Sequence, residues 1–290
     1  MDLNWKKKND SEELMDVERA GVPYLIFPAL EETGLVSHGF STRLGGVSEG
    51  KFSAMNFTFT RGDDPEHVRE NYRRMAKALG VDANRMVLSY QTHTTHIRRI
   101  TEEDAGKGII KERDYQDVDG MITDIPGITL VTFYADCVPL YLLDPVHRAI
   151  GLSHSGWRGT VGRMGQQTIE AMKHAYGTCA QDLIVCIGPS ICQDCFEVGE
   201  EVVEEFHHAF RREYWERLVR SGREDRFQLD LWEANRIIFL EAGVNPANIH
   251  VTNRCTHCNP KLLFSHRTCG NERGNLAAFL CLSEDPISPI

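Results

Sequence analysis

Two apolar runs joined by Asp144-Pro145-Val146-His147 predict a β-hairpin in the middle of the chain. Asp at the first position of a turn and Pro at the second are typical of a type I turn, because proline fixes φ near the required value. If Asp144 pairs with His147, the antiparallel register continues into both runs. Cys137 then lies directly opposite His154. Opposed residues have Cβ atoms about 4.5–5.5 Å apart, so this thiol and imidazole could share a metal ion or a proton.

The composition excludes several classes of protein. The chain has 290 residues, 41% of them hydrophobic, which is enough for a substantial core, yet no stretch is long and apolar enough to cross a membrane. The N-terminus lacks the apolar segment of a signal peptide. A net charge of -10 without a basic cluster argues against a nucleic-acid surface. We therefore expect a cytoplasmic protein that acts on a small molecule as a monomer or small homo-oligomer, with neither a nucleic-acid nor a membrane partner.

The order of helix and strand patterns predicts one α+β domain over residues 1–290, in which residues 1–20 form a polar N-terminal extension. Asp64-Pro65 before an amphipathic run and Gly80 after it predict a capped helix over residues 66–79. Further helices are expected over residues 164–176, 198–214 and 231–242, and strands over residues 128–133, 138–143, 149–153, 183–187 and 248–251. The hairpin favours this class over a doubly wound parallel sheet.

A third residue would complete a metal site at the hairpin. A catalytic zinc site needs about three protein ligands and one open position, and His and Cys are common donors. His93 is the third residue that we favour, and we interpret its segment, residues 89–97, as β-rich. His96 lies three residues further on, so in a strand the two side chains point to opposite faces. Only one of them can reach the site.

The hairpin cysteine and histidine also fit a mechanism without metal. An imidazole can lower the pKa of a neighbouring thiol, and the thiolate can then attack a carbonyl, as in a Cys/His amidohydrolase. Such a dyad needs an orienting group, whereas a metal site needs a third ligand. Asp136, directly before Cys137, could carry a proton or orient a neighbour, although it would point away if it is in a strand. We therefore expect catalysis to involve Cys137, His154 and Asp136.

Two Cys-x-x-Cys pairs, Cys192/Cys195 and Cys255/Cys258, each resemble half of a structural zinc site. Their separation far exceeds the about 15–20 residues usual in zinc ribbons, although distant pairs can meet in space. Because the nine cysteines are odd in number and no signal sequence precedes them, we expect reduced thiols rather than disulfides. We favour buried or incidental thiols for the two pairs. A shared structural zinc, and with it a zinc-stabilised interaction module without enzymatic activity, is the alternative.

An anion-binding loop is predicted near the N-terminus. Ser41-Thr-Arg-Leu-Gly-Gly-Val-Ser48 combines hydroxyl groups with two glycines, which allow close approach of the backbone to an anion. Arg43 adds a charge that can bind an anion through two hydrogen bonds. The alternative is an ordinary glycine turn with a solvated arginine.

Seven short motifs, taken together, closely resemble one family. It is the laccase-domain family, first described as multicopper polyphenol oxidoreductases and later as purine nucleoside phosphorylases with adenosine deaminase activity. The resemblance extends from about His38 to Leu280. The motifs are His38-Gly-Phe-Ser-Thr-Arg-Leu-Gly-Gly-Val-Ser48, Gln91-Thr-His93, Asp119-Gly120, Ala135-Asp-Cys137-Val-Pro139, His154-Ser-Gly-Trp-Arg-Gly159, Ile187-Gly-Pro-Ser190 and Phe264-Ser-His-Arg267.

The resemblance implies a four-layer α/β/β/α sandwich with mixed sheets, similar to the catalytic domain of cytotoxic necrotizing factor toxins. It also implies a metal site on His93, Cys137 and His154. Zinc is the expected ion and copper is possible by the Irving–Williams order, but the chain has no His-x-His pair of the kind that a multicopper oxidase needs. This chain departs from the family pattern near its C-terminus, where an expected arginine falls near Asn275.

We therefore expect a zinc-dependent purine nucleoside phosphorylase with adenosine deaminase activity. Its expected substrates are phosphate and adenosine, inosine, guanosine or methylthioadenosine, and zinc would activate water for attack at purine C6. His38 and Arg43 are the residues that we expect to bind phosphate. The alternatives are the metal-free amidohydrolase and a copper-dependent polyphenol oxidase.

Overall fold

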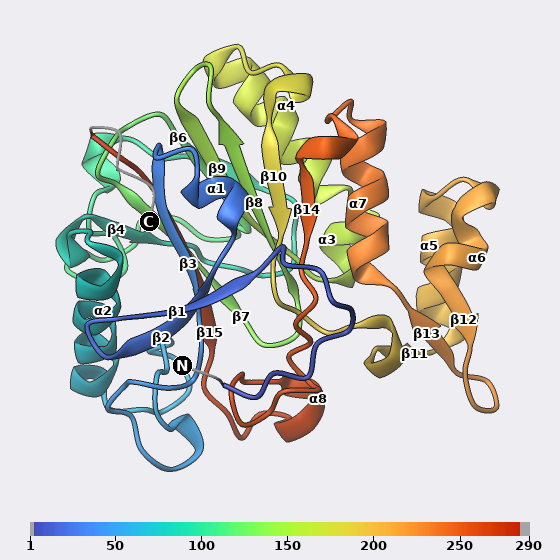
Figure 1. Cartoon of the computed structure of the whole chain (residues 1–290), viewed down its shortest axis with the longest axis horizontal. Coiled ribbons are helices and arrows are strands. Elements are labelled where there is room, and N and C mark those ends of the chain that lie inside the picture. The colour runs from blue at the N-terminus through green and yellow to red at the C-terminus, as the bar shows by residue number, and fades with distance from the viewer. Residues whose placement is uncertain (1–2, 285–290) are drawn as a thin grey trace.

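The computed structural model describes residues 3–284, whose strands form two six-stranded mixed sheets and one small sheet (Figure 1). The first sheet has the order β1 (Met15–Arg19), β2 (Val22–Ile26), β3 (Val36–Ser41), β15 (Leu276–Leu282), β7 (Thr129–Tyr134) and β4 (Met86–Leu88). The second has the order β14 (Ile249–Val251), β10 (Ile184–Ile187), β8 (Val138–Asp144), β9 (Ala149–Ser155), β6 (Gly120–Thr123) and β5 (Ile97–Arg99). The small sheet contains β11 (Glu197–Val198), β13 (Phe227–Leu229) and β12 (Val219–Ser221).

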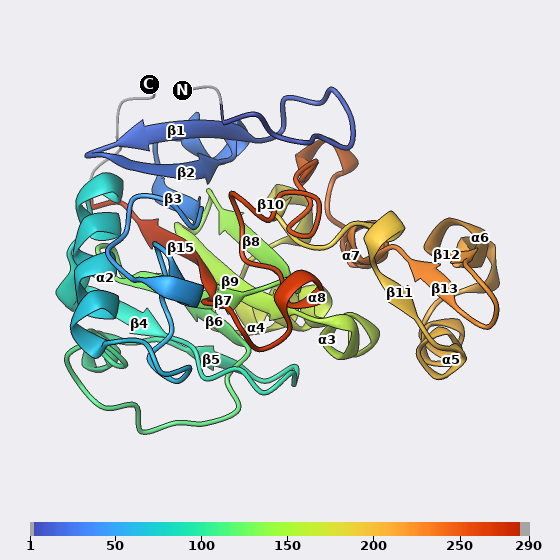
Figure 2. The same ribbon diagram turned by 90° about the horizontal axis from the view of Figure 1, so that it is seen from below.

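Helices cover the outer faces of the two large sheets (Figures 1 and 2). The α-helices are α1 (Pro28–Glu31), α2 (Pro65–Leu79), α3 (Trp157–Val161), α4 (Met164–Tyr176), α5 (Glu200–Ala209), α6 (Trp215–Leu218), α7 (Leu231–Glu241) and α8 (His266–Cys269). One apolar core joins α2 to the first sheet, a second fills the space between the sheets, and a third joins the second sheet to α4 and α7. These four layers confirm the α+β class predicted from the sequence and the α/β/β/α sandwich implied by the family resemblance.

The central strands are apolar because both of their faces are buried. In β8, Leu140 and Leu142 face the core under α4 and α7, whereas Tyr141 and Leu143 face the first sheet. This alternation follows the two-residue period of a strand. A strand covered on both sides reads as a continuous apolar run, which is why its position was predictable.

Helix α2 ends where the sequence predicts and begins one residue earlier. The Asp64 side chain accepts a hydrogen bond from the Glu66 N–H, Pro65 is the first helical residue, and Gly80 adopts a left-handed φ of 70°. Helix α4 has the bounds expected from its pattern. The helix expected over residues 198–214 is shorter, because α5 ends at Ala209.

The β8–β9 hairpin has a longer loop than the sequence suggested, so the predicted register is wrong by two residues. Asp144 pairs with Ala149, and Pro139 rather than Cys137 lies opposite His154. The cause is the Asp144 carboxylate, which accepts hydrogen bonds from the backbone N–H groups two and three residues on, so a four-residue loop forms. Because a shift of two residues keeps every side chain on its original face, Cys137 and His154 remain on the same side.

Part of the expected N-terminal extension forms a strand. Met15–Arg19 pairs along its whole length with Val22–Ile26 at the edge of the first sheet. β1 is the edge strand of this sheet, and charged side chains such as those of Asp16, Glu18 and Arg19 are typical of an edge strand, where they oppose pairing with another chain. Within the described residues, no helix is long and apolar enough to cross a membrane.

Candidate functional site

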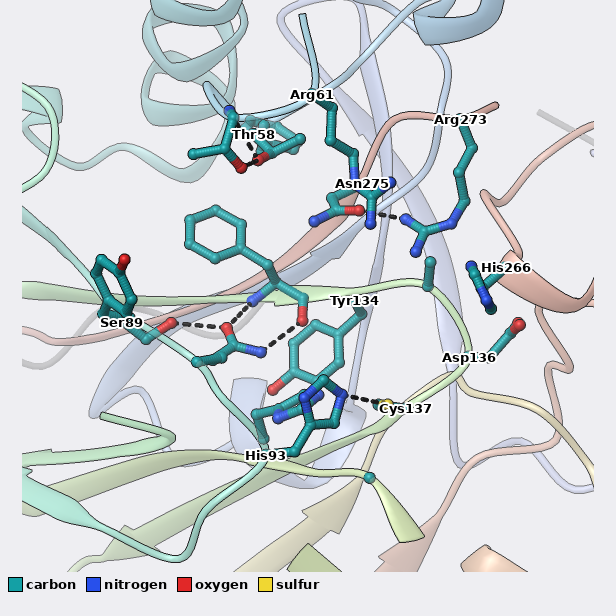
Figure 3. A pocket seen from close by; sticks show the side chains of 18 of the residues that line it. Thr58, Arg61, Ser89, His93, Tyr134, Asp136, Cys137, His266, Arg273 and Asn275 are labelled. Atoms are coloured by element: carbon teal, nitrogen blue, oxygen red, sulfur yellow. Dashed lines mark hydrogen bonds between the residues drawn. The ribbon is translucent and has the colours of Figure 1, made fainter. Parts of the chain in front are cut away.

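A cavity of about 660 Å³ opens where the chain crosses between the two large sheets. His93 lies in the crossing from β4 to β5, and Cys137 lies in the crossing from β7 to β8. His154 is near the end of β9 in the second sheet. All three side chains line the cavity. Residues from the loop before α2 and from the C-terminal segment also line it, among them Arg61 and Arg273 (Figure 3).

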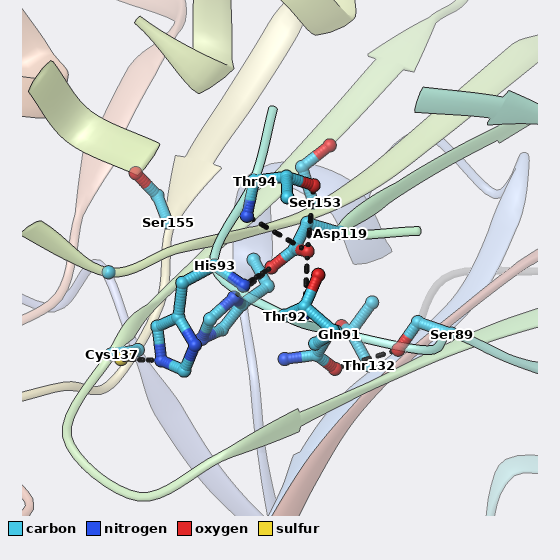
Figure 4. A network of polar contacts seen from close by, with 12 residues as sticks. Ser89, Gln91, Thr92, His93, Thr94, Asp119, Thr132, Cys137, Ser153 and Ser155 are labelled. Atoms are coloured by element: carbon cyan, nitrogen blue, oxygen red, sulfur yellow. Dashed lines mark hydrogen bonds and ion pairs between the residues drawn. The ribbon is translucent and has the colours of Figure 1, made fainter. Parts of the chain in front are cut away.

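The side chains of His93, Cys137 and His154 converge as the sequence predicts. One nitrogen or sulfur atom from each lies within 4.8 Å of the other two. The Cys137 Sγ lies 4.0 Å from His93 Nε2 (Figure 4). The ring centroids of His93 and His154 are 5.0 Å apart. Two imidazoles and one thiolate form the type of donor set that zinc prefers at a catalytic centre. His93 is exposed and borders the cavity, so substrate or water can approach from that side.

A buried carboxylate that our sequence analysis did not assign to the site holds both histidines. Asp119 is fully buried, and its Oδ1 lies 2.8 Å from His154 Nδ1. The same carboxylate accepts hydrogen bonds from the backbone N–H groups of three successive residues, Thr92, His93 and Thr94 (Figure 4). A carboxylate on the distal nitrogen of a metal-binding histidine fixes its ring and raises its basicity. The signal that could have identified it was the Asp119-Gly120 motif.

His93 owes its orientation to a loop rather than to a strand, so the strand interpretation of residues 89–97 is wrong over most of its length. Only the final residue, Ile97, belongs to a strand, and His93 has a left-handed φ of 66°. This conformation lets three successive N–H groups point at one carboxylate. His96 turns away, because its Nδ1 lies 3.0 Å from the Asp117 carbonyl oxygen, and it does not line the cavity.

The electrostatic interactions between Cys137 and His154 favour a bound cation. Burial alone would raise the pKa of Cys137, but the His154 and His93 imidazoles lower it below its usual value. Burial alone would lower the pKa of His154, but the Cys137 thiolate and Asp119 raise it. The site thus stabilises positive charge beside a thiolate, whether that charge is a proton or a metal ion.

Asp136 anchors the loop before Cys137. Its carboxylate accepts hydrogen bonds from Thr256 Oγ1 and from the Arg267 N–H, each 2.6 Å long. Its backbone has a left-handed φ of 92°, so Asp136 is not part of a strand as the sequence suggested. Because both Asp136 carboxylate oxygens accept hydrogen bonds from the protein, we infer that Asp136 positions the loop rather than transfers a proton.

Although the chain as a whole is acidic, five arginines of the described part of the chain line the cavity: Arg61, Arg113, Arg158, Arg267 and Arg273. Asp136 is the one carboxylate among the described residues that line it. Arg273 is only 6% exposed, and burial and the nearby Arg61 lower its pKa to about 10. Neither Arg61 nor Arg273 forms an ion pair within residues 3–284, and the buried Arg273 Nε has no hydrogen-bond partner there. These two guanidinium groups are therefore available to an anion in the cavity.

The two residues predicted to bind phosphate make other contacts in this structure. His38 is 2% exposed, and its Nε2 accepts a hydrogen bond from the Phe27 N–H. The Arg43 side chain donates to the carbonyl oxygens of Ser53 and Pro260, so it ties two loops together. Neither residue lines the cavity.

An arginine is expected near Asn275, and this chain has one two residues earlier, at Arg273. Arg273 Nη1 donates to Asn275 Oδ1, and both side chains line the cavity beside Arg61 (Figure 3). The chain therefore has a positive charge on this wall of the cavity, although the arginine is at position 273 rather than near 275.

A model of the multi-copper polyphenol oxidoreductase laccase family matches residues 37–283, which is most of the chain. The chain belongs to this family. The family predicted from the seven motifs is therefore confirmed.

Relatives in the laccase family include proteins named for nucleoside chemistry. The purine nucleoside phosphorylase YlmD of Geobacillus stearothermophilus is 35% identical over 85% of this chain and 90% of its own length. The adenosine deaminase RL5 of an unknown prokaryotic organism is 36% identical over 81% of this chain and 90% of its own length. The crystal structure of YlmD from Geobacillus stearothermophilus has a TM-score of 0.86, with 33% identity over 93% of this chain and 99% of that chain.

If the laccase-family site binds zinc, His93 and His96 should respond differently to substitution. We expect His93→Ala to weaken zinc binding by at least about 10- to 100-fold. Loss of a residue that only supports a metal ligand already costs this much, and His93 is itself a proposed ligand. His96→Ala should leave zinc affinity unchanged, since this ring faces the Asp117 carbonyl. Competition titration against a chromogenic chelator measures both. Loss of zinc from His96→Ala with retention in His93→Ala would reverse the assignment.

Proposed function

We propose that the chain catalyses two reactions at one zinc site, the phosphorolysis of purine nucleosides and the deamination of adenosine. The observation that carries this proposal is the convergence of His93, Cys137 and His154 beside an arginine-lined cavity, in a chain about 35% identical to proteins named for each reaction. Adenosine, inosine, guanosine and methylthioadenosine are the nucleosides that we propose as substrates. When bound, zinc would supply the activation of water needed for deamination.

The donor set supports zinc over copper. One thiolate and two imidazoles leave a fourth position open, which is the arrangement of catalytic zinc sites. A polyphenol oxidase would need a multicopper centre, yet within residues 3–284 only three histidines line the cavity, and one of them, His266, is hydrogen-bonded to the Gly270 carbonyl. We therefore do not propose oxidase activity.

The role of Asp119 in either reaction is to hold the two histidines. Its hydrogen bond to His154 Nδ1 leaves the other ring nitrogen directed toward Cys137 and the cavity. Its three hydrogen bonds to the His93 loop fix the position of the second imidazole. Preorganised donors of this kind avoid the cost of ordering the ligands when substrate binds.

The walls of the cavity offer partners for the two halves of a nucleoside. Tyr90 is 39% exposed and lines the cavity with Phe133, so an aromatic surface is available for stacking against a purine. Gln91 ties these two segments together, because its amide accepts from the Phe133 N–H and donates to the Phe133 carbonyl. Phosphate, which is an anion, needs positively charged partners, and we assign this role to Arg61 and Arg273.

Phosphorolysis forms a bond between phosphate and C1′ of the ribose and breaks the bond from C1′ to the base nitrogen. The departing base takes up a proton, and the sugar carries positive charge in the transition state. An anion held by Arg61 and Arg273 is thus both the nucleophile and a stabilising charge. Deamination of adenosine needs water but no phosphate.

Arg61→Ala should separate the two activities. We expect phosphorolysis to fall about 10- to 100-fold, because a lost hydrogen bond to a charged group costs about 1.5–3 kcal/mol, while deamination changes little. The measurement follows inosine formation without phosphate and ribose 1-phosphate formation with phosphate, using adenosine as substrate. Arg43→Ala, which alters an arginine outside the cavity, is the control. Equal losses of both activities in Arg61→Ala would remove this residue from the phosphate role.

A second function is favoured by one specific observation. Cys137, His154 and Asp119 are arranged in the order nucleophile, base and orienting carboxylate, which is also the order of a cysteine hydrolase. In this alternative the chain is a Cys/His amidohydrolase that acts without metal.

Chelation distinguishes the two functions. We expect removal of zinc to abolish deamination of adenosine, and stoichiometric zinc to restore it. The same metal-free protein should release no ammonia from glutamine side chains of a test peptide. Ammonia release from glutamine by the metal-free protein, together with no activity of the zinc-loaded protein on adenosine or inosine, would replace our proposal with the amidohydrolase.

A further inference from the structure

A second group of metal-binding side chains lies outside the cavity, where the two Cys-x-x-Cys pairs meet. The Sγ atoms of all four cysteines lie within 4.8 Å of one another. We favoured incidental thiols because the pairs are so far apart in the sequence. The strand order brings the two pairs together despite this separation. The first pair follows β10 and the second follows β14, and these two strands are parallel neighbours in the second sheet (Figure 1).

The pairing of the two chain segments continues beyond the strands to the cysteines themselves. Ser190 and Cys255 form an isolated parallel bridge, and the Thr256 N–H donates to the Ser190 carbonyl. The residues between the two pairs include α5, α6, the small sheet and α7. Much of this segment extends away from the sandwich and returns to it (Figure 1). The sequence separation therefore measures the length of an insertion, not the distance between the thiols.

The local geometry resembles two zinc knuckles. The first pair flanks a 3₁₀ turn in which the Cys195 N–H donates to the Cys192 carbonyl. In the second, the Asn259 side chain caps the turn by donating to the Cys255 carbonyl. The Cys192 N–H points at Cys255 Sγ at 3.3 Å, a contact that stabilises a thiolate.

The spacing of the sulfurs fits one tetrahedral ion. With Zn–S bonds of about 2.3 Å, the sulfurs of a tetrahedral site lie about 3.8 Å apart. Cys195 Sγ and Cys258 Sγ are 3.5 Å apart, and no sulfur of the four is more than 4.8 Å from another. All four are free thiols, and two of them are buried. Incidental buried cysteines would pack against apolar side chains, whereas these four face one another.

A cation lies beside this four-cysteine cluster. Lys8 Nζ is 2.5 Å from the Asp194 carboxylate, and Asp194 lies between the two cysteines of the first pair. The N-terminal segment is fixed there by hydrogen bonds of the Lys6 backbone to the side chain of Asn259. Four thiolates around a divalent cation carry a net negative charge, so a nearby ammonium is favourable.

We propose that Cys192, Cys195, Cys255 and Cys258 bind one zinc ion in a closed structural site. This inference goes beyond the proposed function and concerns residues outside the cavity. The ion fastens together the segments that leave β10 and β14. Both segments also hold Asp136, because the Ile191 N–H donates to its carbonyl and Thr256 donates to its carboxylate. The structural zinc thereby supports the loop from which Cys137 extends.

Metal analysis of single variants of the full chain tests the proposal. Wild-type protein purified under reducing conditions with zinc should contain about two ions per chain, one in each site. Cys258→Ser should retain about one, as should Cys137→Ser, whereas the combined variant should retain none. Cys179→Ser, which removes an exposed thiol outside both groups, is the matched control and should keep about two. Equal zinc in Cys258→Ser and Cys179→Ser would overturn the proposal.

Cobalt substitution provides a readout that does not depend on how well variants of the four-cysteine cluster fold, because all four of its cysteines are kept. In the Cys137→Ser background, cobalt should give the intense visible and charge-transfer bands of a tetrahedral tetrathiolate complex. Their absence in folded protein, or the presence of disulfides within the group by mass spectrometry, would also overturn it. Because the two sites share no ligand, failure of this proposal leaves the proposed function standing, and the reverse is also true.

Discussion

Replacing Cys137 with alanine should lower deamination of adenosine by at least roughly 1,000-fold. The reason is that the thiolate is the one anionic donor of the proposed catalytic zinc site, and a metal contributes several kcal/mol to stabilising charge in a transition state. Zinc content should fall by about one ion per chain at the same time. Initial rates of inosine formation and elemental analysis give the two measurements.

Cys179→Ala is the control for this variant, because that cysteine is exposed and belongs to neither metal group. It should keep both the activity and the zinc of the wild type. The zinc assignment fails if Cys137→Ala keeps all of its metal. The catalytic assignment fails if the variant loses its metal and still deaminates adenosine at the wild-type rate.

Removal of the Asp119 side chain should produce the largest loss of stability among single substitutions near the site. Asp119→Ala leaves three backbone N–H groups and His154 without their shared partner. Breaking a buried charged network in this way costs about 3–5 kcal/mol of unfolding free energy. Zinc affinity should also fall, by about 10- to 100-fold, as expected for the partner of a metal-binding histidine.

Denaturant unfolding of the metal-free protein and zinc competition titration test this prediction separately. Asp124→Ala removes a carboxylate that is partly exposed and makes one long ion pair with Arg99, so it should change neither quantity appreciably. Asp119→Asn should have an intermediate effect, because the amide keeps an acceptor oxygen but loses the charge. If Asp119→Ala behaves like Asp124→Ala in both measurements, Asp119 does not organise the site.

The parts of the fold that could be predicted are those whose signals are local. Asp64, Pro65 and Gly80 mark the ends of α2 through capping chemistry that depends only on neighbouring residues. The β8–β9 hairpin was also predicted, but not the length of its loop. That length depends on how Asp144 distributes its hydrogen bonds, and several turn types accommodate Asp-Pro equally well.

Most of the first sheet could not be predicted, because its order depends on contacts between distant residues. β15 lies between β3 and β7 in the sheet. In the sequence, more than half of the chain separates it from β3, and nearly half of the chain separates it from β7. Its burial on both faces is a tertiary property. The same limitation applies to the site, where Asp119 joins the His93 loop to β9. A sequence pattern indicates that Asp119 is present but not which groups it contacts.

The location of His93 and Cys137 has a mechanical consequence. Each lies where the chain passes from the first sheet to the second, so an ion bound by both would cross-link the two sheets. The spacing of the donors is then set by how closely the sheets pack, which is determined by side chains such as Leu130 and Tyr141 in the layer between them. A change in that apolar layer would be transmitted to metal affinity without touching a ligand. Conversely, loss of such an ion would remove this cross-link at the end of the sandwich where the cavity opens.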